Sequence, residues 1–425
     1  MCIRDSFKED VRLDIKCHAS ECEWHERRLP IHTVDETIFK SPPALLIGTV
    51  DKFAQLPRKP ELGRIFGLDT PNRPGLIIQD ELHLISGPLG TVTGLYESAI
   101  DLLCSTEDIR PKIIGSTATI GQAEAQVRSL FNRSVLQFPP PGIDASDSFF
   151  AVRDDLAPDR LYLGISSAGR SPKFALQAVL GSAMQSIHSA RELGSWSDDD
   201  ADPYWTTVAY FNSLRELGGA IVMTLDDVPR TMQFVAGRQG TTIRPMQQEP
   251  TELSSRIPSS KIPEELKKLN VKLGGDPWSG EPVDAVLASN MISVGVDVPR
   301  LGLMVVNGQP KSTAEYIQAT SRVGRGLPGL VCTVLNFGRP RDVAHFEHFQ
   351  NYHAALYRSV EATSVTPWAP RARDKALHAV LIAALRQLTP GLRLDEAARD
   401  FDSNHVLVGQ VVEYLIERSR MASNG

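Results

Sequence analysis

Short apolar runs that end in polar or small residues recur along this chain, with helical stretches between them. They fall in two series, at 44–48, 75–79 and 112–115, and then at 160–164, 207–211, 284–288, 303–307 and 330–334. Short strands that alternate with helices are typical of βαβ units, in which neighbouring strands run parallel. The pattern therefore predicts an α/β protein with parallel sheets.

A proline-rich break separates the two series. Pro139-Pro-Pro-Gly142 can continue neither a helix nor a strand ladder. The 425 residues are enough for two or three domains. We therefore expect a first domain over 1–140, a linker over 141–156 and a second domain over 157–345.

Strand signals fade after about residue 345. Helical periodicity returns at 376–387 and 406–420, so we expect 346–425 to be a C-terminal helical extension. The acidic run Asp198-Asp-Asp-Ala-Asp202 is interpreted as a solvated loop.

Composition and charge exclude several classes of protein. A net charge of −6 excludes a globally basic nucleic-acid wrapper, although a local basic groove remains compatible with it. No apolar run approaches the ~20 residues of a membrane span, and residues 1–10 lack an apolar signal stretch. Five scattered cysteines are too few for a disulfide framework. We expect a cytoplasmic protein without a membrane partner.

The strongest local signal is Leu76-Ile-Ile-Gln-Asp-Glu-Leu-His83, an apolar strand followed by two adjacent carboxylates. The carboxyl ends of strands in α/β sheets face the crevice that binds ligands. There, Asp80 could hold Mg²⁺ through water and Glu81 could act on an attacking water, as phosphoryl transfer requires. The plainer interpretation is a helix N-cap aspartate followed by a first-turn glutamate.

Three further sequence blocks carry hydroxyl, carboxylate or arginine side chains. They are Ser116-Thr-Ala-Thr119, Ser289-Asn-Met-Ile-Ser-Val-Gly-Val-Asp297 and Gln318-Ala-Thr-Ser-Arg-Val-Gly-Arg325. Arg322 and Arg325 are three apart, which predicts one face of a helix start and a lateral grip on a phosphate. Alternatively, the two arginines lie on a solvated helical face.

In order and spacing, these blocks resemble superfamily 2 helicases. Asp80-Glu-Leu-His83 is similar to the Walker B motif of the DEAH type and Ser116–Thr119 to the Ser-Ala-Thr motif. Ser289–Asp297 resembles motif V, and Gln318–Arg325 resembles motif VI. The resemblance implies two RecA-like lobes with parallel sheets, of which the first is incomplete, and an ATP site between the lobes.

The resemblance also implies roles for individual residues. Asp80, Glu81, His83, Arg322 and Arg325 would be catalytic, with Mg²⁺ held by Asp80 through water. Nucleotide contacts would come from Ser116, Thr117, Thr119, Gly295, Asp297 and Gln318, with Asp297 on the ribose. Nucleic acid would be touched by Thr49, Lys52, Ser289 and Asn290.

A closer resemblance is to the helicase subunit of the DISARM anti-phage system. It rests on Gln79–Gly90, Gly308–Gln318 and Ser359–Pro367. It implies an ATP-dependent DNA helicase or translocase that works with other defence subunits on single-stranded DNA or duplex junctions. An RNA helicase and a catalytically decayed scaffold remain open alternatives.

The chain departs from the family in one respect. No G-x-x-x-x-G-K-[ST] phosphate loop occurs in the 425 residues. Lys311-Ser-Thr313 could substitute for the phosphate loop, but we interpret Ser312 as a helix N-cap. Because the family places this loop before the blocks above, we expect an N-terminally truncated chain that is inactive alone.

Cys17-His-Ala-Ser-Glu-Cys22 could supply half of a tetrahedral zinc site. His18 and His25 are available but oddly spaced. The resemblance suggests half of a zinc ribbon near 17–25, and two ordinary cysteines in a polar loop are the alternative. Cys104 and Cys332 lie in apolar runs and are expected in the core.

Overall fold

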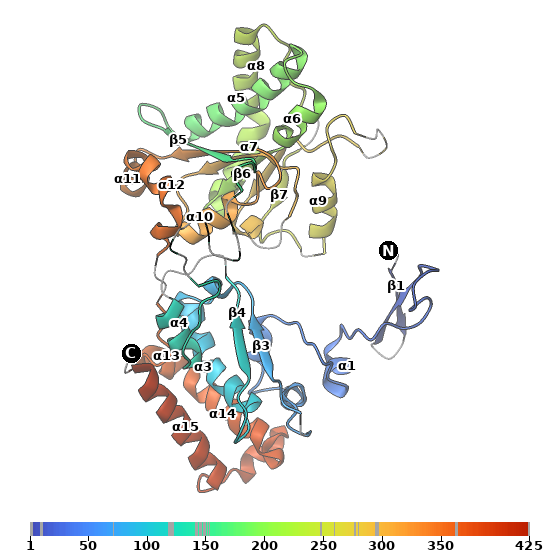
Figure 1. Ribbon diagram of the computed structural model, residues 1–425, viewed down its shortest axis with the longest axis vertical. Coiled ribbons are helices and arrows are strands. Elements are labelled where there is room, and N and C mark those ends of the chain that lie inside the picture. The colour runs from blue at the N-terminus through green and yellow to red at the C-terminus, as the bar shows by residue number, and fades with distance from the viewer. Residues whose placement is uncertain are drawn as a thin grey trace. The chain divides into compact units, whose positions relative to one another are not determined.

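A computed structural model gives the structure of the chain (Figure 1). It describes residues 3–8, 12–70, 72–117, 123–140, 154–246, 249–258, 260–275, 280–293, 297–361 and 364–423, together with 143, 147, 150, 152 and 278. The chain forms two compact units: unit 1 comprises 1–138 and 362–425, and unit 2 comprises 139–361.

Unit 2 is built on a six-stranded parallel sheet with the order β5-β10-β9-β6-β8-β7. The strands are β5 (Arg160–Ser166), β6 (Thr207–Phe211), β7 (Thr251–Leu253), β8 (Ala285–Ala288), β9 (Leu303–Asn307) and β10 (Gly329–Leu335). The helices are α5 (Pro172–Glu192), α6 (Asp198–Trp205), α7 (Leu214–Asp226), α8 (Val228–Gln239), α9 (Ile262–Leu269), η4 (Asn290–Ser293), α10 (Thr313–Thr320), α11 (Pro340–Glu347), α12 (Phe349–Ala354) and η5 (Leu356–Ser359). The five strands expected in this half of the chain are confirmed.

Helices cover both faces of this sheet, which is why its central strands are apolar throughout. Alternate strand residues such as Ala209 and Val305 pack with α5, α7 and α8 on one face. Their neighbours Tyr210 and Val306 pack on the other face with α10 and with partly buried side chains from α9, α12 and η5. Figure 1 shows the same layering, with the sheet between the two helical layers. Burial on both faces removes the polar alternation of a one-sided sheet.

Unit 1 contains a parallel pair, β3 (Leu76–Gln79) and β4 (Lys112–Gly115), and an antiparallel pair, β1 (Ile3–Lys8) and β2 (Arg12–Cys17). Its first helices are α1 (Asp35–Lys40), α2 (Val50–Phe53), η1 (Pro60–Phe66), η2 (Leu82–Leu84), α3 (Gly87–Cys104) and α4 (Ala123–Phe131). The main core of the unit forms around the buried residues of α3, such as Leu95 and Leu103.

The C-terminal residues 364–423 complete the core of unit 1. Their elements are α13 (Pro370–Ala372), the π-turn η6 (Arg373–Leu377), α14 (His378–Leu388), η7 (Pro390–Leu392), η8 (Asp395–Asp400) and α15 (Val406–Ser423). Val380, Leu385 and Leu415 pack against the buried side chains of α3 and η1. Residues 346–361 group with unit 2 instead, so the segment expected as one extension is divided between the two units.

Two local expectations are wrong. Residues 44–48 form no strand: Leu45 and Ile47 are largely exposed, and no ladder pairs with them among the described residues. The run Asp198–Asp202 is the start of helix α6 and not a loop. Ser197 caps that helix in a capping box with Asp200, and three acidic residues in the first turn complement the helix dipole.

Among the described residues, no helix has both the length and the hydropathy that crossing a membrane requires.

Candidate functional site

The two carboxylates of Asp80-Glu81 follow directly after β3, as the sequence predicts. Asp80 is exposed, and its Oδ1 accepts a hydrogen bond of 3.0 Å from the Glu81 backbone N–H. Glu81 has left-handed backbone angles, φ 52° and ψ 44°. A non-glycine residue in this region is strained, and such strain often accompanies function. The turn leaves both carboxylates near the end of the parallel pair.

Backbone hydrogen bonds join this turn to the residues after β4. The Ser116 N–H donates to the Gln79 carbonyl (2.8 Å), and the Leu82 N–H donates to the Ser116 carbonyl (2.9 Å). Leu82 is buried in a small cluster with Ile113, and a Cβ at Gly115 would lie 2.8 Å from its Cδ2. Gly115 is therefore required for the close approach of the two turns.

His83 links the carboxylates to the hydroxyl block. Its Nδ1 lies 3.1 Å from Thr117 Oγ1 and 3.5 Å from Glu81 Oε2, and the side chain is almost fully buried. The hydroxyl beside His83 thus belongs to Thr117, whereas Ser116 contributes its backbone. Thr119, expected in the same relay, lies outside the described residues.

Behind β3 lies a buried charged cluster that sequence reasoning missed. The Gln79 amide donates to the buried carboxylate of Glu97 on α3. One turn further along α3, Asp101 accepts hydrogen bonds from Arg110 (2.5 Å), Arg133 (2.5 Å) and Arg418 of α15 (2.8 Å). The sequence signal was available: two acidic residues four apart on an otherwise apolar helix face.

The two acids of this cluster have different electrostatics. Burial raises the pKa of Glu97 to about 7, against the attraction of Arg418 and its hydrogen bond from Gln79. Burial would also raise the pKa of Asp101, but Arg418, Arg110 and Arg133 together hold it below its usual value. Glu97 therefore changes charge near neutral pH while Asp101 stays ionised.

In unit 2, the motif V residues follow the buried strand β8. The Ser289 N–H donates to the Leu253 carbonyl of β7 (3.2 Å), and its hydroxyl donates to Asn290 Oδ1 (3.4 Å). Ser289 is buried and Asn290 is exposed at the start of η4. Gly295 lies outside the described residues.

The two arginines of motif VI lie at the end of helix α10, not at the start of a helix as expected. The helix ends at Thr320 with Ser321 as its C-cap, and Gln318 is buried in its last turn. Arg325 donates to the Ser321 carbonyl (3.1 Å) and forms an ion pair with Asp297 (2.7 Å). Asp297, expected on a ribose, therefore holds a motif VI arginine here.

Lys311-Ser-Thr313 forms the start of α10, which confirms the N-cap interpretation. The Ser312 hydroxyl accepts from the Glu315 N–H (3.2 Å). The Thr313 N–H donates to both carboxylate oxygens of Glu361 (3.0 and 2.8 Å). A glutamate side chain thus already lies at the helix N-terminus where a phosphate would bind.

The expected nucleic-acid residues of unit 1 lie around helix α2. Thr49 is the exposed N-cap residue of α2 and does not end a strand, because none forms at 44–48. Lys52 binds the carboxylate of Asp35 at 2.5 Å from each oxygen. A phosphate would have to compete with Asp35 for this ammonium group.

The cysteine pair supplies at most half of a zinc site. Cys17 is buried at the end of β2 and Cys22 is half-buried in the following turn, and both are free thiols. The nearby histidines are engaged: His18 Nδ1 pairs with Glu26 (2.5 Å), and His25 Nδ1 lies 3.1 Å from the Ala19 carbonyl. No group of three or more ligating side chains occurs in the described part of the chain. Zinc binding stays a prediction. Cys104 and Cys332 are buried core residues, as expected.

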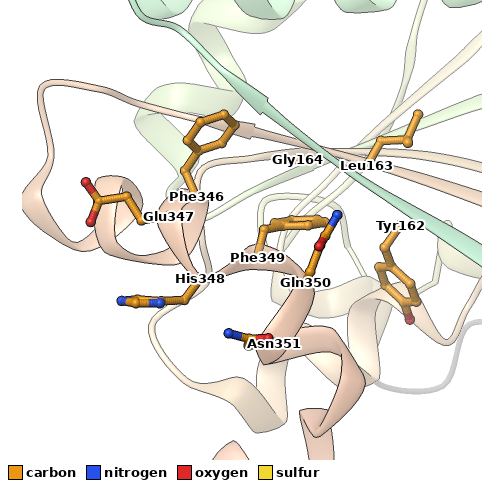
Figure 2. A pocket seen from close by; sticks show the side chains of 9 residues that line it. All are labelled: Tyr162, Leu163, Gly164, Phe346, Glu347, His348, Phe349, Gln350 and Asn351. Carbon is orange, nitrogen blue, oxygen red and sulfur yellow. The ribbon is translucent and has the colours of Figure 1, made fainter.

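An open hollow of about 430 Å³ lies beside the edge strand β5 of unit 2. Figure 2 shows Tyr162, Leu163 and Gly164 of that strand on one side and residues 346–351 on the other. A Cβ at Gly164 would lie 2.7 Å from Phe349. Residue 164 must therefore be glycine for the Phe349 ring to pack against the strand. None of the motif residues lines this hollow.

Comparisons with known proteins agree with this architecture. Residues 227–326 match the family model "Helicase conserved C-terminal domain". The chain is 41% identical over 444 residues to the DISARM protein DrmA of Bacillus paralicheniformis, which covers 95% of this chain and 38% of that protein. The chain therefore spans less than half the length of this relative.

Two solved helicases share the fold at low sequence identity. MrfA, solved with DNA and AMPPNP, is 16% identical with a TM-score of 0.55, covering 82% of this chain and 42% of that one. Lhr of Mycobacterium smegmatis, solved with single-stranded DNA and AMP-PNP, is 16% identical with a TM-score of 0.50, covering 83% and 40%. These similarities establish RecA-like lobes in this chain. Residues 227–326 thus carry a helicase C-terminal domain, and nearly the whole chain is similar to the DISARM protein DrmA.

Proposed function

We propose that the protein is an ATP-dependent DNA helicase or translocase that acts in anti-phage defence. The observation that carries the proposal is the strained Asp80-Glu81 turn, bonded through Leu82 and His83 to Ser116 and Thr117. Adjacent carboxylates beside a hydroxyl-bearing turn suit a reaction in which water attacks a phosphate. The similarity to helicases also supports the attack of water on a phosphate.

The roles that we propose for unit 1 follow from its geometry. Asp80 is exposed, and one of its oxygens already accepts from a backbone N–H, so its carboxylate fits a hydrated Mg²⁺ ion. Bound there, the ion would neutralise charge on the transferred phosphate. Glu81 would orient and deprotonate the attacking water. His83 would hold the Glu81 carboxylate in place and pass its position to Thr117.

In unit 2, Arg322 and Arg325 would stabilise the charge that develops on the phosphate. A guanidinium fork suits this task because it donates two parallel hydrogen bonds. Arg325 would have to exchange its bond with Asp297 for the phosphate. Gln318, buried in the preceding helical turn, would fix the start of this loop.

We propose that Thr49, Lys52, Ser289 and Asn290 contact the phosphate backbone of the nucleic acid. Such contacts position a strand without reading its sequence. DNA is favoured over RNA because MrfA and Lhr were solved with DNA. We also propose that the protein works in the cytoplasm with further defence subunits; the similarity to a DISARM protein supports the defence role.

The test is ATP hydrolysis by the full-length protein with single-stranded DNA, duplex junctions or RNA. We expect DNA to stimulate hydrolysis more than tenfold, with chelation of Mg²⁺ abolishing it. Stronger stimulation by RNA would identify an RNA helicase. Nucleic-acid binding without any hydrolysis would identify a scaffold and refute the proposed enzyme.

A further inference from the structure

Helix α10 delivers the motif VI arginines, and its first residue is anchored by a carboxylate from a distant part of the chain. Thr313 donates to Glu361 from its N–H (3.0 and 2.8 Å) and from its hydroxyl (3.1 Å). Thr313 itself is buried. Because the first N–H groups of a helix have no partner inside it, an anion at this end is favourable. Glu361 therefore fixes the start of α10.

A chain of donated hydrogen bonds extends this anchor. The Gln309 amide donates to the Tyr352 hydroxyl (3.1 Å), and that hydroxyl donates to Thr313 Oγ1 (3.1 Å). Donors arranged in sequence polarise one another, and this chain of donors ends on the carboxylate of Glu361. The anchor thus joins the loop before α10, helix α12 and the last residue of unit 2.

The far end of α10 is held by aromatic side chains. The Tyr162 hydroxyl lies 3.3 Å from Thr320 Oγ1, and the Tyr316 hydroxyl lies 3.0 Å from both Thr333 Oγ1 and His353 Nε2. The helix is therefore fixed at both ends and is only eight residues long. Release of its first residue would loosen the helix, and a shift of about 1 Å in the turn that carries Arg322 could lower the rate of catalysis by ~10²-fold.

We propose that Glu361 is a positioning residue for the motif VI arginines. It anchors the start of helix α10, and the turn that carries the arginines follows the end of the same helix. The inference rests on the proposed ATPase function.

The experiment compares Glu361→Ala, Glu361→Gln and Glu361→Asp in the full-length protein. Glu347→Ala is the matched control, because Glu347 is an exposed glutamate of the same unit whose side chain makes no hydrogen bond among the described residues. We expect Glu361→Ala to lower the kcat of DNA-stimulated hydrolysis at least tenfold, with the KM for ATP changed less than threefold. Gln keeps one acceptor oxygen and should fall between wild type and Ala. A kcat equal to that of the control would overturn the positioning role. Thermal unfolding of each variant separates these effects from simple instability.

Hydrogen exchange tests the Glu361 anchor separately from the proposed ATPase function. In Glu361→Ala, the Thr313 amide should exchange at least tenfold faster, with no change in the control, whether or not the protein hydrolyses ATP. If the wild type proves inactive but this amide loses protection, the proposed function fails and the Glu361 anchor stands. Unchanged protection refutes the anchor itself.

Discussion

Glu81 lies in the left-handed region of backbone space, where a residue with a side chain costs roughly 1–2 kcal/mol. The cost is offset by the bonds around it: the Glu81 N–H to Asp80, the Leu82 N–H to Ser116, and the burial of Leu82. This conformation directs the Glu81 and Asp80 side chains differently from two successive residues of a strand. The strain is thus coupled to the placement of the two carboxylates.

We expect Glu81→Gln in the full-length protein to lower ATP hydrolysis by about 10²- to 10⁴-fold while leaving ATP binding intact. The amide has nearly the same shape but cannot take a proton from water. Steady-state hydrolysis and nucleotide binding are measured beside Glu61→Gln, an exposed glutamate of η1 in the same unit. Hydrolysis within threefold of wild type would show that Glu81 is not the base.

Arg325→Lys should lower hydrolysis by ~10² or more, with a smaller change in nucleotide affinity. Lysine keeps the charge but loses the fork that reaches both the Ser321 carbonyl and Asp297. Arg215→Lys, at an exposed position on α7, is the control. Normal DNA-stimulated turnover by Arg325→Lys would remove this arginine from the mechanism.

At this scale, the sequence suggests candidate catalytic residues more readily than it suggests the residues that hold them in place. Asp80, Glu81 and the two arginines lie in short contiguous motifs that can be recognised in the sequence. Glu97 and Glu361 do not, because their partners are 18 and 48 residues away along the chain. A pairing across that distance depends on the fold and leaves no local pattern.

Among the elements, helices α3 and α15 are joined by a buried ionic cluster. Asp101 is almost fully buried and accepts from Arg418, which also donates to the Leu130 carbonyl (3.1 Å). Tyr414 of α15 adds a further hydrogen bond to Asp101 (3.2 Å). The last helix of the chain is therefore held to the helix behind β3 by charge as well as by apolar contacts.

Removing Arg418 should destabilise unit 1 by roughly 3–5 kcal/mol, because one cation is lost from a buried carboxylate. Arg418→Ala is compared with Arg420→Ala, an exposed arginine on the same helix. Chemical denaturation followed by a probe in unit 1 measures the difference. If both variants unfold at the same denaturant concentration, Arg110 and Arg133 are sufficient for Asp101.

Glu97 makes the stability of unit 1 depend on pH. Its pKa is raised from 4.5 to about 7 in the folded state, so the folded protein binds this proton more tightly than the unfolded chain. Stability from this group is therefore fully present below about pH 4.5 and is lost as the pH rises to about 7. The difference is at most about 3 kcal/mol.

Glu97→Gln should remove this dependence and keep an acceptor for the Gln79 amide. We expect the variant to be more stable than wild type at pH 8 and no more stable at pH 4.5, measured by chemical denaturation. Glu61→Gln provides the control for a surface glutamate. Parallel pH profiles for Glu97→Gln and wild type would show that folding does not raise the pKa of Glu97.

The elements themselves were predicted well where both faces of a strand are buried. The limits of β6 and β9 coincide with the expected apolar runs, since a buried strand in a parallel sheet is apolar along its length. The run 44–48 has the same composition but no partner strand, and so does not form one. Composition alone cannot tell these cases apart.

At the scale of the whole molecule, the grouping of the C-terminal helices with unit 1 could not be read from the sequence. Their apolar periodicity predicts an amphipathic face but not the surface that covers it. The structure assigns that surface to α3 and η1. Residues separated by about 300 positions therefore form one core, as Arg418 and Asp101 show.

The 425-residue chain by itself should bind nucleic acid weakly and hydrolyse no ATP. Its sequence contains no glycine-rich phosphate loop, and the start of α10, the nearest substitute, is already bonded to Glu361. Without backbone amides and a lysine on the β- and γ-phosphates, the triphosphate has no firm anchor beside Asp80. On the pair β3–β4, Leu76, Ile78 and Ile114 are exposed, so the isolated chain should also bind an apolar dye and self-associate. Purified 425-residue protein is assayed for DNA-stimulated hydrolysis, with Glu81→Gln as the background control. Activity above that background would mean that residues within this chain bind the phosphates, and Lys311→Ala would then test whether the start of α10 does so in spite of Glu361.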